Sequence, residues 1–225
     1  MFKTETHLHV KETSPCSRIM AEEMVQYYYD AGYKTLIVSD HFQAGFFEPI
    51  KELPWSEQVE RFLAGYKAVQ KAAEKFGMNV ILSAEIRFNS SRNHYLLYGI
   101  DEAFLKARPD ILDMTIETFA PYAKAAGVTI VQAHPLRDGK CIPTFEWVDG
   151  VEAYNANPRH ENFTAETLKL AKEWNLPITG GSDTHRMEDI ALCGIKTAEE
   201  IRAAEDYVRA LMSGEFEIIG MGEDQ

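Results

Sequence analysis

Apolar positions along the chain follow two alternating periods. Short runs rich in β-branched and apolar residues are separated by longer stretches in which apolar residues recur every three or four positions. Strands repeat their side-chain direction every two residues and helices about every 3.6, so this alternation predicts repeated strand–helix units around parallel strands. We predict seven strands, at residues 3–9, 35–40, 79–85, 95–98, 128–133, 150–154 and 177–182.

Two of the intervening helices are marked clearly. Apolar residues between positions 59 and 76 fall on one helical face, with Glu57, Lys67 and Glu74 outside it, and Gly77 then supplies a stop. A second apolar face covers residues 201–211, after a Thr197-x-x-Glu200 capping box. A strand–helix repeat of this length fits a closed barrel better than an open sheet.

Composition indicates one domain over residues 1–225. The chain of 225 residues is 45% hydrophobic, and no Pro/Gly/Ser-rich linker or charge block divides it. No stretch approaches the roughly 20 apolar residues of a membrane span, and the first residues do not resemble a leader, so we expect a cytoplasmic protein without membrane partners. Cys16, Cys141 and Cys193 are too widely spaced for a disulfide framework or thiolate zinc site, and reduced, mostly packed thiols are expected.

Net charge restricts the class of partner. The formal charge of -12 opposes binding of long nucleic acids, because that binding needs clustered Lys and Arg. A locally positive metal site can still accept a small phosphate.

Histidines and acids gather at the ends of the predicted strands. Two histidines with i, i+2 spacing close the first strand, and the other residues follow four later strands: His7, His9, Asp40, His41, Glu85, His134, Asp183 and His185. Residues two apart in a strand point the same way, and barrel enzymes build their sites at the C-terminal strand ends. Six of the seven histidines lie in strand or strand-end segments.

Each of these residues has an ordinary structural explanation when taken alone. Asp40 can cap a helix, Glu85 can form a buried ion pair, His134 before Pro135 can belong to a turn, and an H-x-H pair is common. Taken together, so many ionisable groups near one barrel mouth would each cost several kcal/mol without compensation. Divalent ions would compensate, because neutral imidazoles and carboxylates are ligands of zinc, manganese and iron.

The ordered motifs resemble the polymerase-and-histidinol-phosphatase (PHP) family of metal-dependent phosphoesterases. The resemblance runs through nearly the whole chain and rests on His7-x-His9, Ala31-Gly32-Tyr33 to Ser39-Asp40-His41, Ala84-Glu85-Ile86, Asn93-His94-Tyr95-Leu96-Leu97, Ala133-His134-Pro135 and Gly181-Ser182-Asp183-Thr184-His185. It implies an α/β fold, a distorted seven-stranded (β/α)7 barrel similar to a TIM barrel, in agreement with the strand count.

The resemblance also implies two or three divalent ions, of zinc, manganese or iron. One ion would take His7, His9, Glu85 and Asp183, and a second would share Glu85 and add His94 and His134. A third would take His41, His185 and a ligand from the loop after the first strand. The family commonly has His or Asp in that loop, whereas this loop reads Lys11-Glu12-Thr13-Ser14-Pro15-Cys16. Glu12 is the expected substitute, because its carboxylate is a hard-ion ligand at nearly the right spacing.

The predicted function is hydrolysis of a small phosphate ester by metal-activated water. Asp183 or His185 would accept or donate the proton, and Arg137, Arg159 and Arg186 lie just beyond strand ends, where they could bind phosphate or form surface ion pairs. Further features have two interpretations each: Asn155 and Asn157 could orient substrate or shape a turn, and the aromatic residues Phe42, Phe46, Phe47 and Trp55 could form a lid or cap the core. His160 is left out of the site.

Three alternatives stay open at this point. The same metal site could act on a nucleotide or short oligonucleotide, which the net charge disfavours. The domain could be a metal-stabilised regulatory or scaffold module without turnover, although nearly every ligand position is filled. Metal-loaded barrels that begin with H-x-H also include amidohydrolases, but the bridging position of Glu85 favours the phosphoesterase family.

Overall fold

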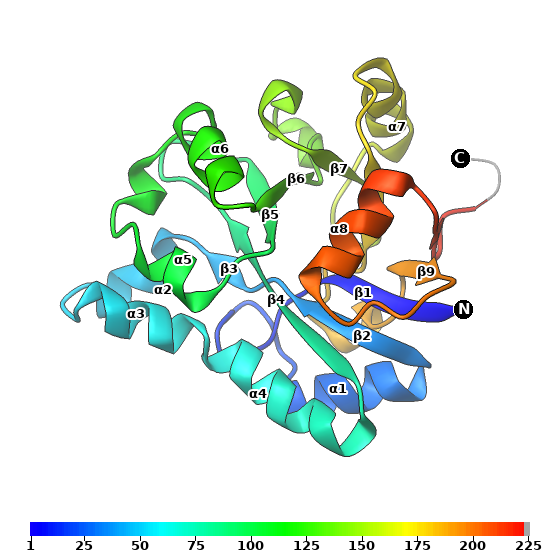
Figure 1. The fold of residues 1–225 in the computed structure, drawn as a ribbon, viewed down its shortest axis with the longest axis horizontal. Helices are drawn as coiled ribbons and strands as arrows, with labels where there is room; N and C mark the ends of the chain where they lie inside the picture. The colour runs from blue at the N-terminus through cyan, green and yellow to red at the C-terminus, as the bar shows by residue number, and fades with distance from the viewer. Residues whose placement is uncertain (223–225) are drawn as a thin grey trace.

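The computed structural model describes residues 1–222 and shows an α/β fold with one nearly closed, barrel-like sheet (Figure 1). All seven predicted strands are present, with bounds within one or two residues of those expected. They are β1 (Phe2–Leu8), β2 (Tyr33–Val38), β4 (Asn79–Ile86), β5 (His94–Tyr98), β6 (Thr129–Ala133), β7 (Gly150–Asn155) and β8 (Ile178–Gly181).

The sheet departs from a seven-stranded barrel because three short strands join it. They are β3 (His41–Phe42), β9 (Ile195–Thr197) and β10 (Glu217–Ile218), and the sheet order is β10-β9-β1-β2-β4-β5-β6-β7-β8, with β3 paired to β4. At its beginning β1 pairs antiparallel with β9, so β8 cannot run along the whole of that edge. The sheet closes only at the other end of β1, through a bridge between Leu8 and Thr184.

One strand runs against the parallel pattern. Strand β5 is antiparallel to both β4 and β6, with His94 opposite Ala133 and Tyr95 opposite Ile86. The beginning of β5 therefore lies at the edge where β4 and β6 end. This direction corrects the expectation of uniformly parallel strands, and it brings His94, which precedes the predicted strand, to the same edge as the strand-end ligands.

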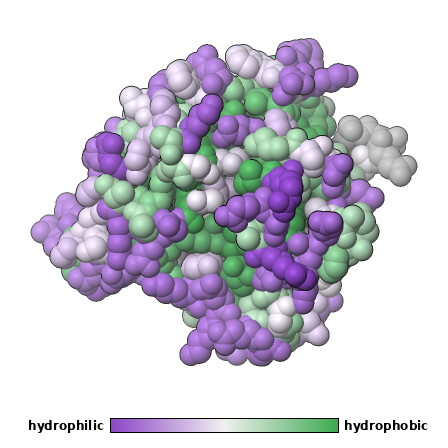
Figure 2. Space-filling model, in the orientation of Figure 1, coloured by the Kyte–Doolittle hydropathy of each residue, from purple (hydrophilic) through white to green (hydrophobic). Residues whose placement is uncertain are grey.

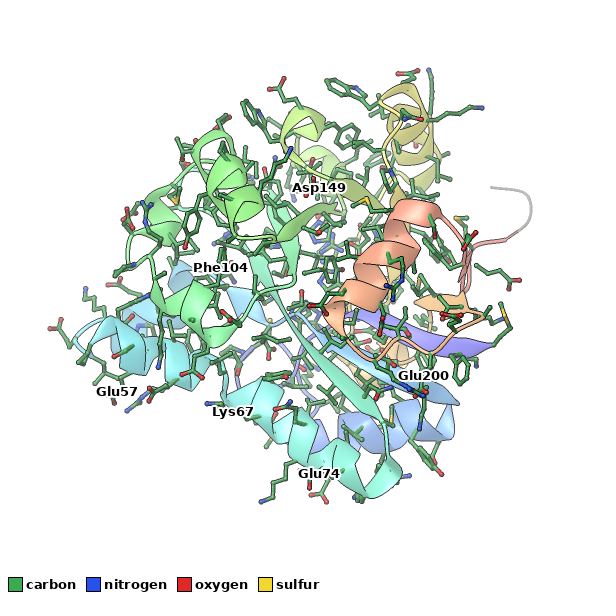
Figure 3. All side chains as sticks on the ribbon, in the orientation of Figure 1. Glu57, Lys67, Glu74, Phe104, Asp149 and Glu200 are labelled. Carbon is green, nitrogen blue, oxygen red and sulfur yellow. The ribbon has the colours of Figure 1, made fainter. Side chains whose placement is uncertain are left out.

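Helices surround the sheet, and all but the last cover its outside (Figure 1). Their bounds are α1 (Ala21–Asp30), α2 (Ala44–Phe47), α3 (Trp55–Phe62), α4 (Ala64–Ala73), α5 (Glu102–Lys106), α6 (Ile116–Ala125), α7 (Thr164–Glu173) and α8 (Ala204–Ser213). The apolar face predicted for residues 59–76 is divided at Leu63, between α3 and α4, and Gly77 ends the segment with a φ of 59°. Glu57, Lys67 and Glu74 project outward, as predicted (Figure 3).

The predicted capping box before the last helix is wrong. Thr197 ends β9, and α8 begins later, at Ala204. Glu200 accepts hydrogen bonds from Asn79 and Arg202, so its carboxylate cannot cap the helix. Asp206 instead accepts from the backbone N–H of Ala203 at 3.1 Å and caps the first turn.

The inside of the barrel is apolar at one end and polar at the other. Inward side chains of the central strands, among them Ile37, Ile81 and Val131, pack with Tyr207 and Leu211 of α8. Helix α8 thus fills the end opposite the strand-end ligands. The remaining apolar side chains form two clusters between the sheet and the outer helices.

The surface seen in Figure 2 is largely hydrophilic, with apolar side chains visible mainly between the helices. None of the described helices combines the length and the apolar character that crossing a bilayer would require.

Candidate metal centre

Eight of the nine predicted metal ligands converge at the C-terminal ends of β1, β4, β6 and β8, together with the beginning of β3 and β5. We divide them by exposure. The buried group, with side chains at most 1% exposed, consists of His7, His9, Glu85, His134 and Asp183; the rim group, 12–17% exposed, consists of His41, His94 and His185. Residues separated by as many as 178 positions, 185 minus 7, therefore share one site.

The buried group places nitrogen and oxygen atoms around common points. The Nε2 atoms of His7 and His9 approach within 3.0 Å of each other, as the i, i+2 spacing predicts. An oxygen of Asp183 lies 3.6 Å from His7 Nε2 and 3.3 Å from His9 Nε2, and the carboxylate of Glu85 lies 3.7 and 3.6 Å from the same two atoms. Glu85 Oε1 also meets Nε2 of His134 at 2.9 Å.

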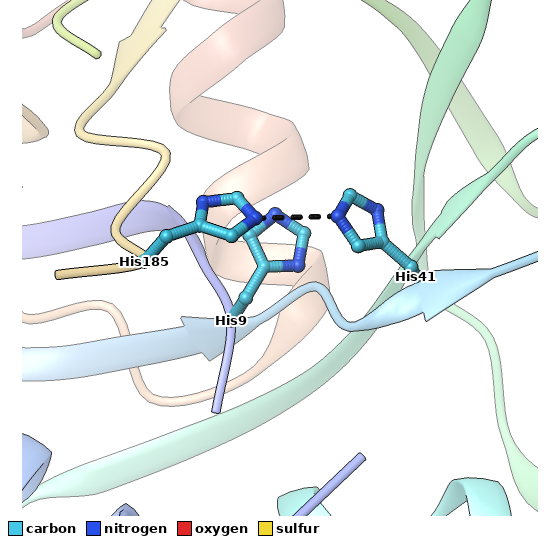
Figure 4. Close-up of side chains that lie close together, drawn as sticks. All are labelled: His9, His41 and His185. Carbon is cyan, nitrogen blue, oxygen red and sulfur yellow. Dashed lines mark hydrogen bonds between the residues drawn. The ribbon is translucent and has the colours of Figure 1, made fainter. Parts of the chain in front are cut away.

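The rim group lies beside the buried group and shares residues with it. His41 Nε2 and His185 Nε2 are 3.2 Å apart, and the ring of His9 lies next to both (Figure 4). His94 contacts Glu85 Oε1 through Nδ1 at 2.8 Å. Glu85 thus stands between the two groups, one oxygen facing His94 and His134 and the other facing His41 and His9.

Two ligands have unusual backbone conformations. His134 has a φ of 31° and Asp183 a φ of 50°, in the left-handed region that side chains other than glycine rarely adopt. Each such residue costs of order ~1–3 kcal/mol and persists where the surrounding structure or a function holds it. His134 immediately follows β6 and Asp183 lies two residues beyond β8, so the unusual backbone turns both side chains toward the site.

Polar residues that the sequence analysis did not select hold the ligands in place. Glu152, buried in β7, accepts from His7 Nδ1 at 2.8 Å and from the backbone N–H of His134 at 3.2 Å. Glu5, buried in β1, accepts from the backbone N–H groups of His7 and Ser182, each at 3.0 Å. Both are acids inside strands, which marks them as unusual in the sequence but does not identify the residues that they support.

The electrostatics of the group depend on burial and on opposite charges. Burial alone would raise the pKa of Asp183, but His7 and Arg137 outweigh it and hold that pKa well below its usual range. Burial likewise opposes ionisation of Glu85, whereas His94 and His41 lower its pKa well below normal. Burial lowers the pKa of His134 to about 4, aided by Arg137. Ionised carboxylates and a neutral imidazole are the forms that bind cations.

Several buried donor and acceptor atoms fit a metal better than a hydrogen-bond network. His9 Nδ1, His134 Nδ1 and Glu85 Oε2 have no hydrogen-bond partner. His41 Nδ1 and Glu85 Oε2 lie 2.6 Å apart, yet neither makes a hydrogen bond. Three groups of residues each have ligand atoms that all lie within 4.8 Å of one another. The groups are His9 with His41 and His185, His7 with His9 and Glu85, and His41 with Glu85 and His94. Neutral imidazoles and carboxylates so arranged suit divalent ions.

The structure does not bring Glu12 into this cluster. Both of its carboxylate oxygens accept from the backbone N–H of Ala21, at 2.9 and 3.2 Å, which is the start of α1. A carboxylate is favourable there because the helix N-terminus offers free N–H groups and a positive dipole end. Asp40 is also structural, since its Oδ1 accepts from Val10 N and Ser14 Oγ.

Cys16 lies where Glu12 was expected. Its thiol is exposed, whereas Cys141 is half-buried and Cys193 is buried, so packed thiols were predicted correctly only in part. Burial would raise the pKa of the Cys16 thiol, but hydrogen bonds with His185 and His41 lower it to about 6. Spacing from the first histidine pair alone did not distinguish Cys16 from Glu12.

A cavity of about 440 Å³ opens over the rim group. The three arginines predicted to bind phosphate line it, together with three cationic residues that were not predicted, and the six are Arg87, Arg92, Arg137, Lys140, Arg159 and Arg186. Arg137 donates to Asp183 Oδ2 at 2.6 Å, and Arg159 forms two hydrogen bonds with Asp189. Arg186 is 3.8 Å from Glu188. His160, left out of the predicted site, is exposed and contacts Asp138 at the cavity edge.

The structure also places the two asparagines and the four aromatic residues for which the sequence allowed two interpretations each. Asn155 donates to Glu152 Oε2 at 2.9 Å and to Asp183 Oδ2 at 3.3 Å, and Asn157 donates to the carbonyl of Asp183 at 3.2 Å. Both therefore fix Asp183. Phe42 and Phe47 are buried in the apolar cluster under α2 and α3, with Phe46 and Trp55 packed against it, which agrees with a core cap.

Known proteins of the PHP type share features with this chain. A family model described as PHP-associated matches residues 159–216, which include α7, β8 and Asp183. Among curated proteins, none is similar enough in sequence to count as a match.

Solved structures show the same fold over nearly the whole chain. A two-domain protein from Bacteroides vulgatus ATCC 8482, containing a "predicted PHP-like metal-dependent phosphoesterase", superposes with a TM-score of 0.69 at 15% identity, covering 96% of this chain and 64% of that one. PsfC from Pseudomonas syringae PB-5123 gives 0.63 at 20% identity, covering 92% and 87%. The lesion-specific endonuclease PfuEndoQ from Pyrococcus furiosus gives 0.63 at 14%, covering 96% and 57%.

These similarities cover different shares of the solved proteins. The chain spans less than two thirds of the Bacteroides and Pyrococcus proteins, and at 14–20% identity the likeness concerns the fold. Together with the match of residues 159–216, they confirm the family resemblance that the ordered motifs indicated.

Proposed function

We propose that this chain, which is PHP-like in its fold and over residues 159–216, is a metal-dependent hydrolase of small phosphate esters. One observation carries the proposal: eight imidazole and carboxylate side chains from six strands or strand ends converge beneath a cavity lined with cationic side chains. Imidazoles and carboxylates bind divalent ions, and arginines bind phosphate.

The family resemblance implies three ligand sets, and the contacts are compatible with them. His7, His9, Glu85 and Asp183 would hold one ion, Glu85, His94 and His134 a second, and His41 and His185 a third, of zinc, manganese or iron. When bound, such ions polarise phosphoryl oxygens and make water a stronger nucleophile at neutral pH.

Asp183 and His185, the two candidates for proton transfer, have different contacts. The carboxylate of Asp183 faces Arg137 and Asn155 on one oxygen and His9 on the other, so it is held as a ligand rather than as a free base. His185 Nδ1 donates to the carbonyl of Asp183 at 3.0 Å, which leaves Nε2 toward the cavity side. With an ion held by His41 and His185, this Nε2 would be its ligand; without that ion, His185 is a better candidate than Asp183 to exchange a proton with the ester oxygen.

Charge supports a phosphate as substrate. The whole chain has a net charge of -12, yet six cationic side chains line this one cavity. Arg137 and Arg159 are held by the buried acids Asp183 and Asp189, so they are pre-oriented, whereas Arg186 is only loosely paired. An anionic ester would be attracted locally although the rest of the surface repels polyanions.

The alternative chemistries are less well supported. Glu85 lies between the ligand sets, which favours phosphate esters over the C–N bonds that amidohydrolases cleave. A nucleotide substrate keeps the same site and differs only in what occupies the cavity.

Phosphate release tests the proposal. Metal-free protein would be loaded with Zn²⁺, Mn²⁺ or Fe²⁺ and assayed against sugar phosphates, amino-alcohol phosphates, phosphotyrosine peptides, nucleotides and a phosphodiester. We expect metal-dependent release from a monoester, lost on chelation. Activity that persists both after chelation and in Asp183→Ala would refute the mechanism, and metal content without turnover on any ester would favour a regulatory module.

A further inference from the structure

The loop between β1 and α1 contains a tight turn that a hydrogen bond closes. Ser17 N donates to Ser14 O at 2.8 Å, with Pro15 and Cys16 as the two central residues. Pro at the first central position suits such a turn, because its φ is already fixed. The turn therefore presents Cys16 at its tip.

Buried serines tie this turn to the strands that carry the ligands. Ser14 Oγ donates to Asp40 Oδ1 at 2.7 Å, directly before His41. Ser17 Oγ donates to the carbonyl of His9 at 2.9 Å, and Arg18 N donates to the carbonyl of His185 at 2.8 Å. The three segments bound by the turn thus carry His9, His41 and His185.

Cys16 lines the same cavity as two of those imidazoles, His41 and His185, whose Nε2 atoms are 3.2 Å apart. His9, fully buried, contributes a third imidazole within 4.8 Å of both. The turn therefore brings one thiol to the cavity that is lined by His41 and His185 of this imidazole group (Figure 4 shows the imidazoles).

An independent observation indicates that a cation binds beside these imidazoles. Glu85 Oε2 is 1% exposed and accepts no hydrogen bond, although it lies 2.6 Å from His41 Nδ1 and 3.6 Å from His9 Nε2. His9 Nδ1 is also buried without a partner. A buried acceptor left unsatisfied costs about 1–3 kcal/mol, more when it is charged, and a cation removes that cost.

We propose that Cys16 is a thiolate ligand of the ion held by His41 and His185, in the position for which the sequence suggested Glu12. The inference rests on the proposed function only in that a divalent ion binds at this centre. A thiolate is a soft ligand, so the rim position should prefer zinc, cobalt or iron(II) to manganese or magnesium, while the buried positions keep a harder set of imidazoles and carboxylates.

Cobalt spectroscopy tests this assignment without an activity assay. Metal-free protein would be titrated with Co²⁺ under reducing conditions, following the near-ultraviolet thiolate-to-cobalt charge-transfer absorption and the bound cobalt. We expect that absorption in the wild type and its loss in Cys16→Ser. Cys141→Ser is the matched control: its half-exposed thiol lines the same cavity but contacts the carbonyl of Arg92, so the absorption should persist.

A second variant separates loss of the ligand from loss of the fold. Cys16→Asp should retain bound cobalt through a carboxylate but show no thiolate absorption. In Cys16→Ser we expect affinity for the rim ion to fall by at least the ~10–100-fold that loss of an outer partner of a ligand costs.

The outcomes distinguish the two proposals. Bound cobalt with phosphate release but no thiolate absorption in the wild type, or absorption that survives in Cys16→Ser, would overturn the role of Cys16 and leave the proposed function standing. Protein that binds no cobalt would contradict both.

Discussion

The buried and rim groups of the metal centre are built differently, although they share Glu85. The buried group has side chains at most 1% exposed, two of its members have strained backbones, and Glu152, Asn155 and Arg137 fix it from outside. The rim group is 12–17% exposed and depends on contacts among its own imidazoles and with Glu85. Pre-organisation therefore decreases from the barrel interior toward the cavity, so the buried ion should be held tightly and the rim ion should exchange more easily.

The largest effect is expected from the buried group. Asp183→Asn removes a carboxylate that lies near both His7 and His9, and we expect phosphate release to fall by ~10³-fold or more, because transition-state charge stabilisation by an ion is worth several kcal/mol. Asp138→Asn, at the cavity edge, is the control and should stay close to wild type. Comparable activity in both variants would show that the buried group does not serve catalysis.

Metal removal should separate the two groups in stages. As a chelator is added, we expect the rim ion to leave first and the buried ion later, with thermal stability falling mainly in the second stage. Binding at 100 times the dissociation constant stabilises by about 2.7 kcal/mol, which sets the scale of that fall. Bound metal and melting temperature, measured on the same samples, check the order. Simultaneous loss of all metal would remove the distinction between the groups.

Glu152→Gln should weaken the buried group without touching a substrate. The amide cannot accept from both His7 Nδ1 and the His134 backbone as the carboxylate does, so we expect metal affinity to fall by ~10–100-fold. Competition with a coloured chelator measures this affinity. The exposed Glu146, changed to Gln, is the control, and equal affinities in the two variants would count against the role of Glu152.

The smallest effect is expected at the cavity edge. Arg186→Gln removes a loosely paired cation, and we expect KM for an anionic ester to rise by ~5–10-fold with kcat nearly unchanged, because exposed charge pairs are worth about 1 kcal/mol. Arg202→Gln, in the exposed segment before α8, should leave both constants unchanged. A fall in kcat alone would instead place Arg186 at the reacting atoms.

Local pattern allowed much of the fold to be predicted. The seven strands could be located because most are short runs rich in apolar or β-branched residues, as 128–133 before His134 shows. Strand direction could not, since β5 has the same composition whether parallel or antiparallel, and only its pairing with β4 and β6 settles it. Strands β3, β9 and β10, of two or three residues, are too short to show any period.

Most of the metal ligands could be predicted from the sequence, but the loop ligand and the supporting acids could not. Residues fixed by strand periodicity and motif order, such as His7, His9 and Asp183, lie together. The loop ligand was misplaced because a turn, rather than a period, decides which side chain points inward, and the free N–H groups of α1 attract Glu12 away. Glu152 was missed because an acid inside a strand gives no indication of the distant His7 that it supports.

The most direct test of the account is an anomalous-scattering map of crystals grown with a divalent metal. The account predicts at least one peak within bonding distance of His7, His9, Glu85 and Asp183, and a neighbouring peak near His41 and His185. Metal bound elsewhere on the protein, with these side chains free of it, would contradict the claim that they form one metal centre.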